Sequence, residues 1–217
     1  MRVFVTVGSA LQPFDRMLRA VDAALRECPA GAFEGVCQSG SSAVEPHGLR
    51  STRTLARSAF DQEMMAADVV VTHAGVGSIC TALRYGHVPV VFPRRARFGE
   101  VANDHQVDIA RTFAEQGRVV VAEDAAAVAT HLKRFMSGAL ARRQAGRTAG
   151  DLRPIEDALL AGPRLRAGSS IARALVRALA ALAPMPELVR GERQARSAHA
   201  AAATGGGSVS GRMRMKT

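Results

Sequence analysis

A short run of small residues follows an apolar strand pattern near the middle of the chain. Residues 69–78 read VVVTHAGVGS, so a buried strand is expected to enter a glycine-bearing turn and a helix that begins near Ser78. Gly75 and Gly77 permit positive φ and let backbone N–H groups from Ala74 onward come close to a ligand. A helix N-terminus adds free amides and partial positive charge, which predicts a diphosphate site. A plain strand-to-helix turn capped by Ser78 explains Gly-x-Gly alone equally well.

A second turn stands at the end of the first strand pattern. Gly8 and Ser9 follow an alternating apolar stretch and precede a helix that starts near Asp15. In a parallel sheet this turn faces the same edge as the turn after residue 73. Gly8 and Ser9 are therefore candidates to line the crevice and to donate to phosphate or to an acceptor. They fit the role of simple turn residues equally well.

A third polar segment leaves the strand that ends near residue 92. Residues 92–106 read FPRRARFGEVANDHQ. Asn103 or Asp104 is placed to cap the following helix, while Asp104 and Gln106 together offer acceptors and donors suited to sugar hydroxyls. Arg94 and Arg95 either face a ligand carboxylate or phosphate or are simply solvated charges.

These segments together resemble a known family. The motif over residues 73–78 with the helix that follows, residues 89–93, and FGE followed by NDHQ up to residue 106 resemble the C-terminal domain of glycosyltransferase family 28. The resemblance is strongest to its short stand-alone members, the PssE-like subunits of bacterial exopolysaccharide synthesis and the small subunit of the eukaryotic two-piece dolichol-linked N-acetylglucosaminyltransferase. The opening residues 4–9 and 14–16 match the start of those subunits, so the resemblance covers about residues 1–137.

The resemblance implies the UDP-sugar-binding half of a GT-B enzyme. It implies that Gly75, Gly77 and Ser78 hold the diphosphate and that Asp104 and Gln106 contact the donor sugar. His73 would mainly shape the loop, and a direct contact with the ligand is the alternative role for it. Members of the family often carry an acidic residue for the ribose hydroxyls three positions after the serine, and this chain has Thr81 there. A membrane-anchored partner subunit would supply the site of a lipid-linked sugar acceptor.

The expected reaction is inverting glycosyl transfer without a metal or other cofactor. Turn and helix amides would stabilise the departing UDP as negative charge develops on it. No catalytic residue is identified, because neither His73 nor Glu100 has an obvious orienting partner in the sequence. The base is therefore expected from a partner or another domain. UDP-glucuronate, UDP-glucose and UDP-N-acetylglucosamine remain open as donors, and Arg94 and Arg95 would suit the carboxylate of the first.

The elements that position these residues alternate between strand and helix patterns. Short β-branched runs and longer helical patterns predict a doubly wound parallel α/β sheet, Rossmann-like, as in the C-terminal half of a GT-B enzyme. The expected strands cover residues 2–7, 33–38, 69–73, 88–92 and 118–122. The expected helices cover residues 14–27, 55–67, 77–86, 103–117 and 125–136.

Charge divides the chain into unequal parts. Residues 1–124 carry 13 Arg and Lys against 14 Asp and Glu, whereas residues 125–217 carry 16 against 5. We expect a UDP-sugar-binding domain at 1–139, a basic helical extension at 140–183 and a disordered tail at 184–217. Within the extension, residues 170–182 have the spacing of an amphipathic helix, which suits a partner, an anionic membrane surface or the sheet itself.

Composition weighs against two other classes of protein. A dinucleotide-binding oxidoreductase should carry Gly-x-Gly-x-x-Gly after its first strand, where this chain has the lone Gly8. A nucleic-acid-binding protein should place basic and aromatic residues on the folded domain, yet residues 1–124 are nearly neutral and aromatic content is 4%. Three cysteines without metal-ligand spacing, and no signal-peptide pattern, favour a cytoplasmic protein. The resemblance implies that it reaches the inner face of the plasma membrane through its partner subunit.

Overall fold

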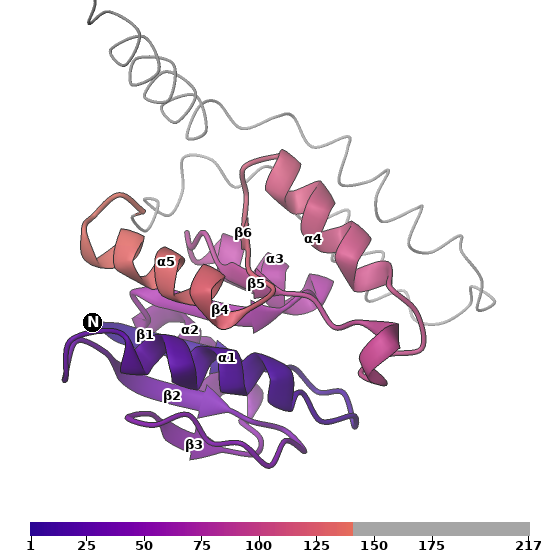
Figure 1. Cartoon of the computed structure of the whole chain (residues 1–217), viewed down its shortest axis with the longest axis horizontal. Coiled ribbons are helices and arrows are strands. Elements are labelled where there is room, and N and C mark those ends of the chain that lie inside the picture. Colours follow the sequence, from indigo (N-terminus) through magenta and orange to yellow (C-terminus); the bar gives the residue numbers. More distant parts are fainter. Residues whose placement is uncertain (141–217) are drawn as a thin grey trace, which may run out of the picture. The chain divides into compact units, whose positions relative to one another are not determined.

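Six short strands form one parallel sheet within residues 1–140, the part of the chain that the computed structural model describes (Figure 1). The strands are β1 (Arg2–Thr6), β2 (Glu34–Gln38), β3 (Arg50–Thr52), β4 (Val69–His73), β5 (Val90–Phe92) and β6 (Val120–Val121). Their order in the sheet is β3-β2-β1-β4-β5-β6. The chain therefore builds outward from β1 to one side and then from β4 to the other. The carboxyl ends of β1 and β4 mark the switch point where such sheets bind ligands.

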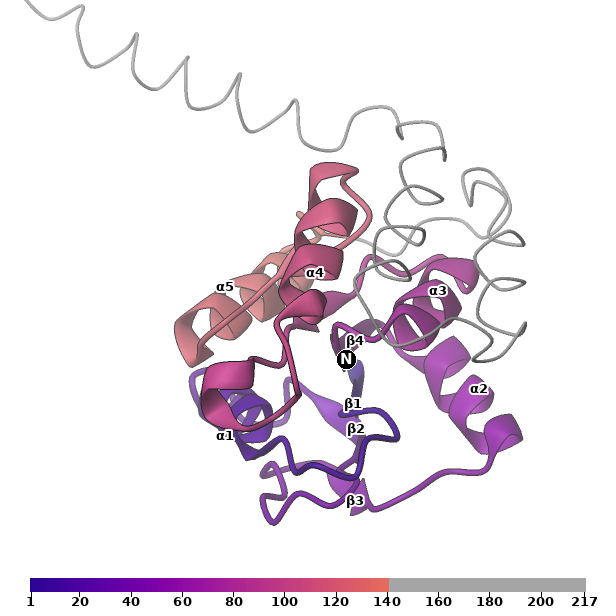
Figure 2. The ribbon, with the colours of Figure 1, turned by 90° about the vertical axis from the view of Figure 1, so that its right-hand side faces the viewer.

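Five α-helices cover the two faces of this sheet. They are α1 (Asp15–Arg26), α2 (Arg57–Ala66), α3 (Val76–Arg84), α4 (His105–Glu115) and α5 (Ala125–Met136). The core on one face joins α1 and α5 to the side chains of Val3, Val5 and Val71. On the other face, two clusters join α2, α3 and α4 to Phe4, Val70 and Val91. Figure 2 shows α1 and α5 on one side of the sheet and α2 and α3 on the other.

Apolar patterning explains why these segments become these elements. β1 and β4 are buried on both faces, as continuous β-branched runs predict for central strands. α1 turns Met17, Leu18 and Val21 inward at helical spacing while Arg19 and Arg26 remain exposed. Each helix buries one apolar stripe against the sheet, and because both faces of the sheet are apolar, helices cover both faces.

The predicted doubly wound parallel sheet is confirmed, with one omission. All five expected strands and all five expected helices are present with ends shifted by up to two residues. The structure adds β3, a three-residue strand that pairs with β2 at the edge of the sheet. Because β3 is polar and partly exposed, its sequence carries no apolar run that would predict it.

The expectations for the basic extension at 140–183, its helix at 170–182 and the tail at 184–217 lie almost wholly outside the described residues. Within residues 1–140, no helix is both long and apolar enough to span a bilayer.

Candidate functional site

The turn after β1 forms one wall of a crevice at the switch point. Gly8 has a φ of +80°, a conformation that glycine adopts without steric cost. Its N–H donates to Thr6 Oγ1 at 3.1 Å, and the Thr6 hydroxyl donates to Gln38 Oε1 at 2.9 Å. The second bond joins the end of β1 to the end of β2, and the first holds the turn against β1. Ser9, the next residue, is exposed at the crevice.

His73, at the end of β4, lies between the two glycine turns. A Cβ atom built on Gly8 or on Gly75 would collide with its imidazole ring. Burial and, to a lesser extent, the nearby Arg94 guanidinium lower the pKa of His73 to about 4, against a smaller opposing effect of a backbone hydrogen bond at Thr6. The ring is therefore neutral at pH 7 and packs against the glycines of both turns.

The helix after β4 begins earlier than the sequence predicts. α3 starts at Val76, with Gly75 at the N-cap, so Ser78 lies in its first turn and is not the cap. Gly75 and Gly77 permit positive φ, but neither residue adopts it. Gly75 has a φ of −82°, and Gly77 is helical and absent from the glycines with positive φ. Position 75 requires glycine because the His73 ring occupies the space that a Cβ atom would fill, not because the backbone there is left-handed.

The N-terminus of α3 offers free amides to the crevice. Bonding within α3 begins with the Ile79 N–H, which donates to the Gly75 carbonyl at 3.0 Å. The N–H groups of the preceding first turn have no intrahelical acceptor, which is the usual basis for binding anions at a helix N-terminus. The whole Ala74 residue is buried, and it is not among the residues that line the pocket described below.

A pocket of about 340 Å³ joins these two walls. Gly8 and Ser9 line it on one side, and Gly77 and Ser78 line it on the other. A Cβ atom on Gly77 would meet nothing within 4 Å, so this position opens directly into space. The remaining lining comes from Gln38, Leu55, Arg57, Phe60 and Thr81. The Thr81 hydroxyl donates to the Gly77 carbonyl at 2.8 Å and is thereby engaged within the helix.

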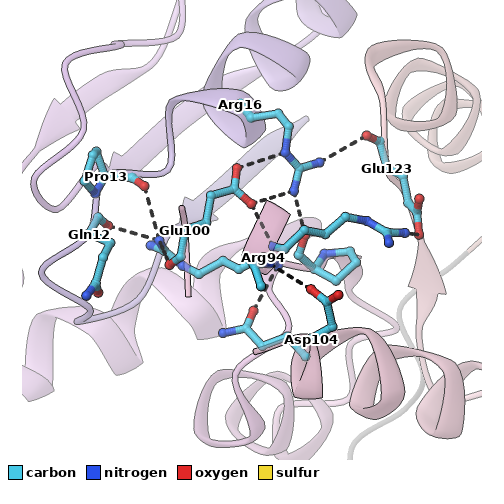
Figure 3. A network of polar contacts seen from close by, with 11 residues as sticks. Gln12, Pro13, Arg16, Arg94, Glu100, Asp104 and Glu123 are labelled. Atoms are coloured by element: carbon cyan, nitrogen blue, oxygen red, sulfur yellow. Dashed lines mark hydrogen bonds and ion pairs between the residues drawn. The ribbon is translucent and has the colours of Figure 1, made fainter. Parts of the chain in front are cut away.

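Arg94 has a structural role that the sequence left open. Its side chain is fully buried, and its guanidinium donates to the carbonyl oxygens of Val7, Gln12, Pro13 and Glu100 at 3.0 to 3.3 Å (Figure 3). The guanidinium also lies 4.3 Å from the centre of the Phe14 ring. Arg94 therefore ties the turn after β1 to the segment after β5 and is not available for a ligand carboxylate.

Arg95 faces another part of the same edge. Its guanidinium pairs with the carboxylate of Glu123, which precedes α5, while its backbone N–H donates to Glu100 Oε2 at 2.8 Å. The Arg95 side chain is 19% exposed. A ligand carboxylate would have to compete with Glu123 for this cation.

Asp104 and Gln106 hold the backbone of the segment that precedes them. Asp104 Oδ1 accepts from the Ala96 N–H at 2.8 Å, and Gln106 Oε1 accepts from the Arg94 N–H at 3.1 Å. Asp104 occupies the N-cap position of α4 without a side-chain capping bond. The Asn103 side chain instead accepts from the His105 N–H at 3.2 Å. Asp104 is exposed and Gln106 is buried, and each keeps a polar atom outside these bonds.

The sequence model described as glycosyltransferase family 28 C-terminal domain matches residues 2–149, which is more than half of the chain. The chain belongs to this family. None of the curated proteins compared with it matches.

Several solved glycosyltransferase structures are similar to this family 28 chain. The kitacinnamycin glycotransferase is 23% identical, with a TM-score of 0.49, and the match covers 63% of this chain and 34% of that one. SnogD from Streptomyces nogalater is 19% identical, with a TM-score of 0.44, and the match covers 92% of this chain and 44% of that one. MurG of Acinetobacter baumannii is 15% identical, with a TM-score of 0.45, and the match covers 64% of this chain and 41% of that one. The chain thus spans less than half the length of each of these proteins.

The family 28 domain brings the expected site residues together in two groups. Gly8, Ser9, Gly77 and Ser78 line one pocket, with His73 and Gly75 packed beneath it. Arg95, Asp104 and Gln106 belong to a polar network after β5. Both groups lie at the carboxyl edge of the sheet, because β1, β4 and β5 are parallel neighbours.

Sequence reasoning missed the wall of the pocket contributed by Gln38 and α2. Gln38 ends a predicted strand, so its place at the carboxyl edge follows from the same rule that identified the other turns. Arg57 and Phe60 lie on a predicted helix, but nothing in their local sequence points to a ligand. Within residues 1–140, no group of three or more His, Cys, Asp or Glu gathers as a metal site would require.

Proposed function

We propose that this chain is the nucleotide-sugar-binding part of an inverting glycosyltransferase. It would transfer a glucosyl, glucuronosyl or N-acetylglucosaminyl group from a UDP-sugar to a lipid-linked acceptor in polysaccharide biosynthesis. The observation that carries this proposal is the pocket of about 340 Å³ between the turn after β1 and the N-terminus of α3, where Gly77 has open space in front of it. Membership of the family 28 C-terminal domain supports the assignment.

The diphosphate would lie against the first turn of α3. There the backbone from Gly75 to Ser78 offers N–H donors and the positive end of the helix dipole. Gly8 and Ser9 would close the other side, and Arg57 would add a cation at the pocket wall. The donor sugar would extend towards Asp104 and Gln106, whose remaining polar atoms suit hydroxyl groups.

Catalysis in this proposal is electrostatic. Negative charge develops on the UDP leaving group as the glycosidic bond breaks, and fixed amide dipoles at the start of α3 stabilise that charge without a metal ion. Such dipoles need no reorganisation during the reaction. Turnover should therefore persist in the presence of EDTA, and its abolition by EDTA with rescue by a divalent cation would overturn this mechanism.

Two candidate bases of the described residues are engaged elsewhere. His73 packs between two glycine turns, and Glu100 accepts two hydrogen bonds from Arg16. A general base needs access to the acceptor hydroxyl, so in this proposal it comes from another domain or chain. We place that base on a membrane-anchored partner subunit at the inner face of the plasma membrane, as for the PssE-like subunits that the sequence resembles.

Donor identity is open among three UDP-sugars. Arg94 is bonded to four carbonyl oxygens and cannot serve a glucuronate carboxylate, which leaves Arg95 as the candidate cation. If Arg95 binds glucuronate, Arg95→Ala should weaken UDP-glucuronate and leave UDP-glucose and UDP-N-acetylglucosamine unchanged. An equal loss of affinity for all three UDP-sugars would show that Arg95 acts only through its ion pair with Glu123.

The transfer reaction itself tests the proposal. The full chain, alone and with the product of a neighbouring gene for a membrane-anchored subunit, would be incubated with each radiolabelled UDP-sugar and a membrane extract. The proposal predicts label in the lipid fraction only when both proteins are present. Robust transfer by the chain alone would overturn the two-subunit arrangement, and no transfer from any UDP-sugar by the pair would overturn the function.

A further inference from the structure

Arg16, in the first turn of α1, reaches across the carboxyl edge to the segment after β5. Its Nε donates to Glu100 Oε1 at 2.9 Å, and a terminal nitrogen donates to Glu100 Oε2 at 2.8 Å, so the ion pair is bidentate (Figure 3). The same terminal nitrogen donates to the Pro93 carbonyl at 2.8 Å, and the other contacts the Glu123 carbonyl at 3.4 Å. One guanidinium thus joins three segments that are distant in sequence.

Aromatic rings fix the orientation of this guanidinium. Its carbon lies 4.7 Å from the centre of the Phe92 ring and 4.8 Å from that of the Phe98 ring. The Phe98 residue is 51% exposed. The Glu100 side chain is only 7% exposed and that of Arg16 is 24% exposed, so the pair is shielded from solvent far more than a surface ion pair. Planar bidentate geometry with stacking is specific to Arg, and Lys does not reproduce it.

Three consecutive backbone amides beside Glu100 are held by three side chains. The N–H groups of Arg94, Arg95 and Ala96 donate to Gln106 Oε1, Glu100 Oε2 and Asp104 Oδ1, respectively. Glu100 therefore shares one short stretch of backbone with Asp104 and Gln106. A change in the position of Glu100 would move the backbone of residues 94–96. Gln106 Oε1 and Asp104 Oδ1, which accept from that backbone, would move with it.

We infer that Arg16 is a positioning residue for recognition of the donor sugar. It acts through Glu100 and the backbone of residues 94–96 to orient Asp104 and Gln106. This inference rests on the proposed function, in which those two side chains contact the sugar. The pocket for the diphosphate is lined by other residues, including Gly8 and Gly77. Loss of the Arg16–Glu100 pair should therefore weaken binding of the sugar and leave binding of UDP unchanged.

Calorimetric titration of the full chain separates these two effects. UDP, UDP-glucose, UDP-glucuronate and UDP-N-acetylglucosamine would each be titrated into the wild-type protein, Arg16→Lys and Glu100→Gln. The matched control is Arg19→Lys, on the same helix, whose side chain is 72% exposed. Circular dichroism would identify which variants are folded, and Glu100→Gln, which keeps the size of the side chain, provides the test if Arg16→Lys does not fold.

The inference predicts that the ratio of the Kd for the best UDP-sugar to the Kd for UDP rises about tenfold in both variants, the scale of one disturbed charge-assisted hydrogen bond. The Kd for UDP should stay within about twofold of wild type, and Arg19→Lys should change neither value. An unchanged ratio in a folded variant would overturn the inference while the proposed function stands. A wild-type protein that binds no UDP would overturn the proposed function and the inference with it.

Discussion

The imidazole ring of His73 occupies the place where a Cβ atom on Gly75 would have to lie. The two residues are separated by one position, yet the contact determines how β4 turns into α3. The same ring also packs against Gly8, so β1 and β4 end on a shared spacer. Both walls of the pocket therefore depend on one neutral histidine.

Replacement of Gly75 by Ala should destabilise the protein through this contact. The φ of −82° and ψ of 127° at Gly75 suit alanine, so backbone strain contributes nothing and the collision with His73 accounts for the loss. We expect a cost of about 1–3 kcal/mol, typical of overpacking, measured by urea unfolding. Gly77→Ala is the control, because its Cβ meets nothing within 4 Å.

A double-mutant cycle with His73→Ala distinguishes this explanation from a general loss of flexibility. If the ring causes the collision, Gly75→Ala should cost much less in the His73→Ala background. Additive losses would contradict the contact.

Stability should fall as the pH falls through the range in which His73 would titrate. The folded protein holds the pKa of His73 near 4, whereas the ordinary value is 6.5. Between these values the unfolded chain binds more protons, so the free energy of unfolding decreases with decreasing pH, by at most about 1.4 kcal/mol per pH unit from this group. The stability is fully present above pH 6.5.

Urea unfolding of wild type and His73→Asn at pH 7.5, 6.0 and 4.5 would isolate this contribution. The wild-type protein should lose more stability than His73→Asn between pH 7.5 and pH 4.5, because asparagine does not titrate. Parallel curves would show that the folded protein does not exclude the proton from His73.

Arg94→Lys should destabilise the domain although it retains the positive charge. An ammonium group cannot reach the four carbonyl oxygens that the guanidinium serves, and buried acceptors without donors are costly. We expect a loss of about 2–4 kcal/mol in urea unfolding. Arg19→Lys, at an exposed site, should stay within about 0.5 kcal/mol of wild type.

Arg94→Lys also addresses the choice of donor. Because Arg94 supports the turn after β1 and the segment after β5, its loss should weaken binding of all UDP-sugars to a similar degree. A selective loss of UDP-glucuronate in calorimetric titration would instead place Arg94 against the sugar carboxylate and contradict its structural role.

Most of the sheet could be predicted because the central strands are apolar runs that are recognisable from local sequence alone. The valine runs of β4 and β5 are buried on both sides, and a residue pattern alone separates them from the amphipathic helices. β3 escaped prediction because an edge strand of three polar residues is defined by its partner β2, not by its own composition. The turns after β1 and β4 were found because the carboxyl edge of a parallel sheet is a general ligand site.

The contacts within the site could not be predicted in the same way. Arg94 and the Gln12 carbonyl are 82 positions apart, and Arg16 and Glu100 are 84 apart. Local sequence presents both arginines as ordinary charged residues, and only the packing of the turn after β1 against the segment after β5 buries Arg94 and shields Arg16 from much of the solvent. The glycine of α3 that faces the pocket was identified by type, but its helical conformation follows from the N-terminus of α3 at Val76.

The most direct test of the central claim is UDP binding by wild type and Gly77→Leu. A leucine at position 77 is a better helix former than glycine, and its side chain would extend from a position with open space into the pocket. Without ligand, Gly77→Leu should unfold at or above the wild-type Tm. UDP should raise the Tm of wild type and bind Gly77→Leu at least about tenfold more weakly, roughly 1.4 kcal/mol. Equal binding of UDP to both proteins, or no binding to wild type, would contradict a diphosphate site at the start of α3.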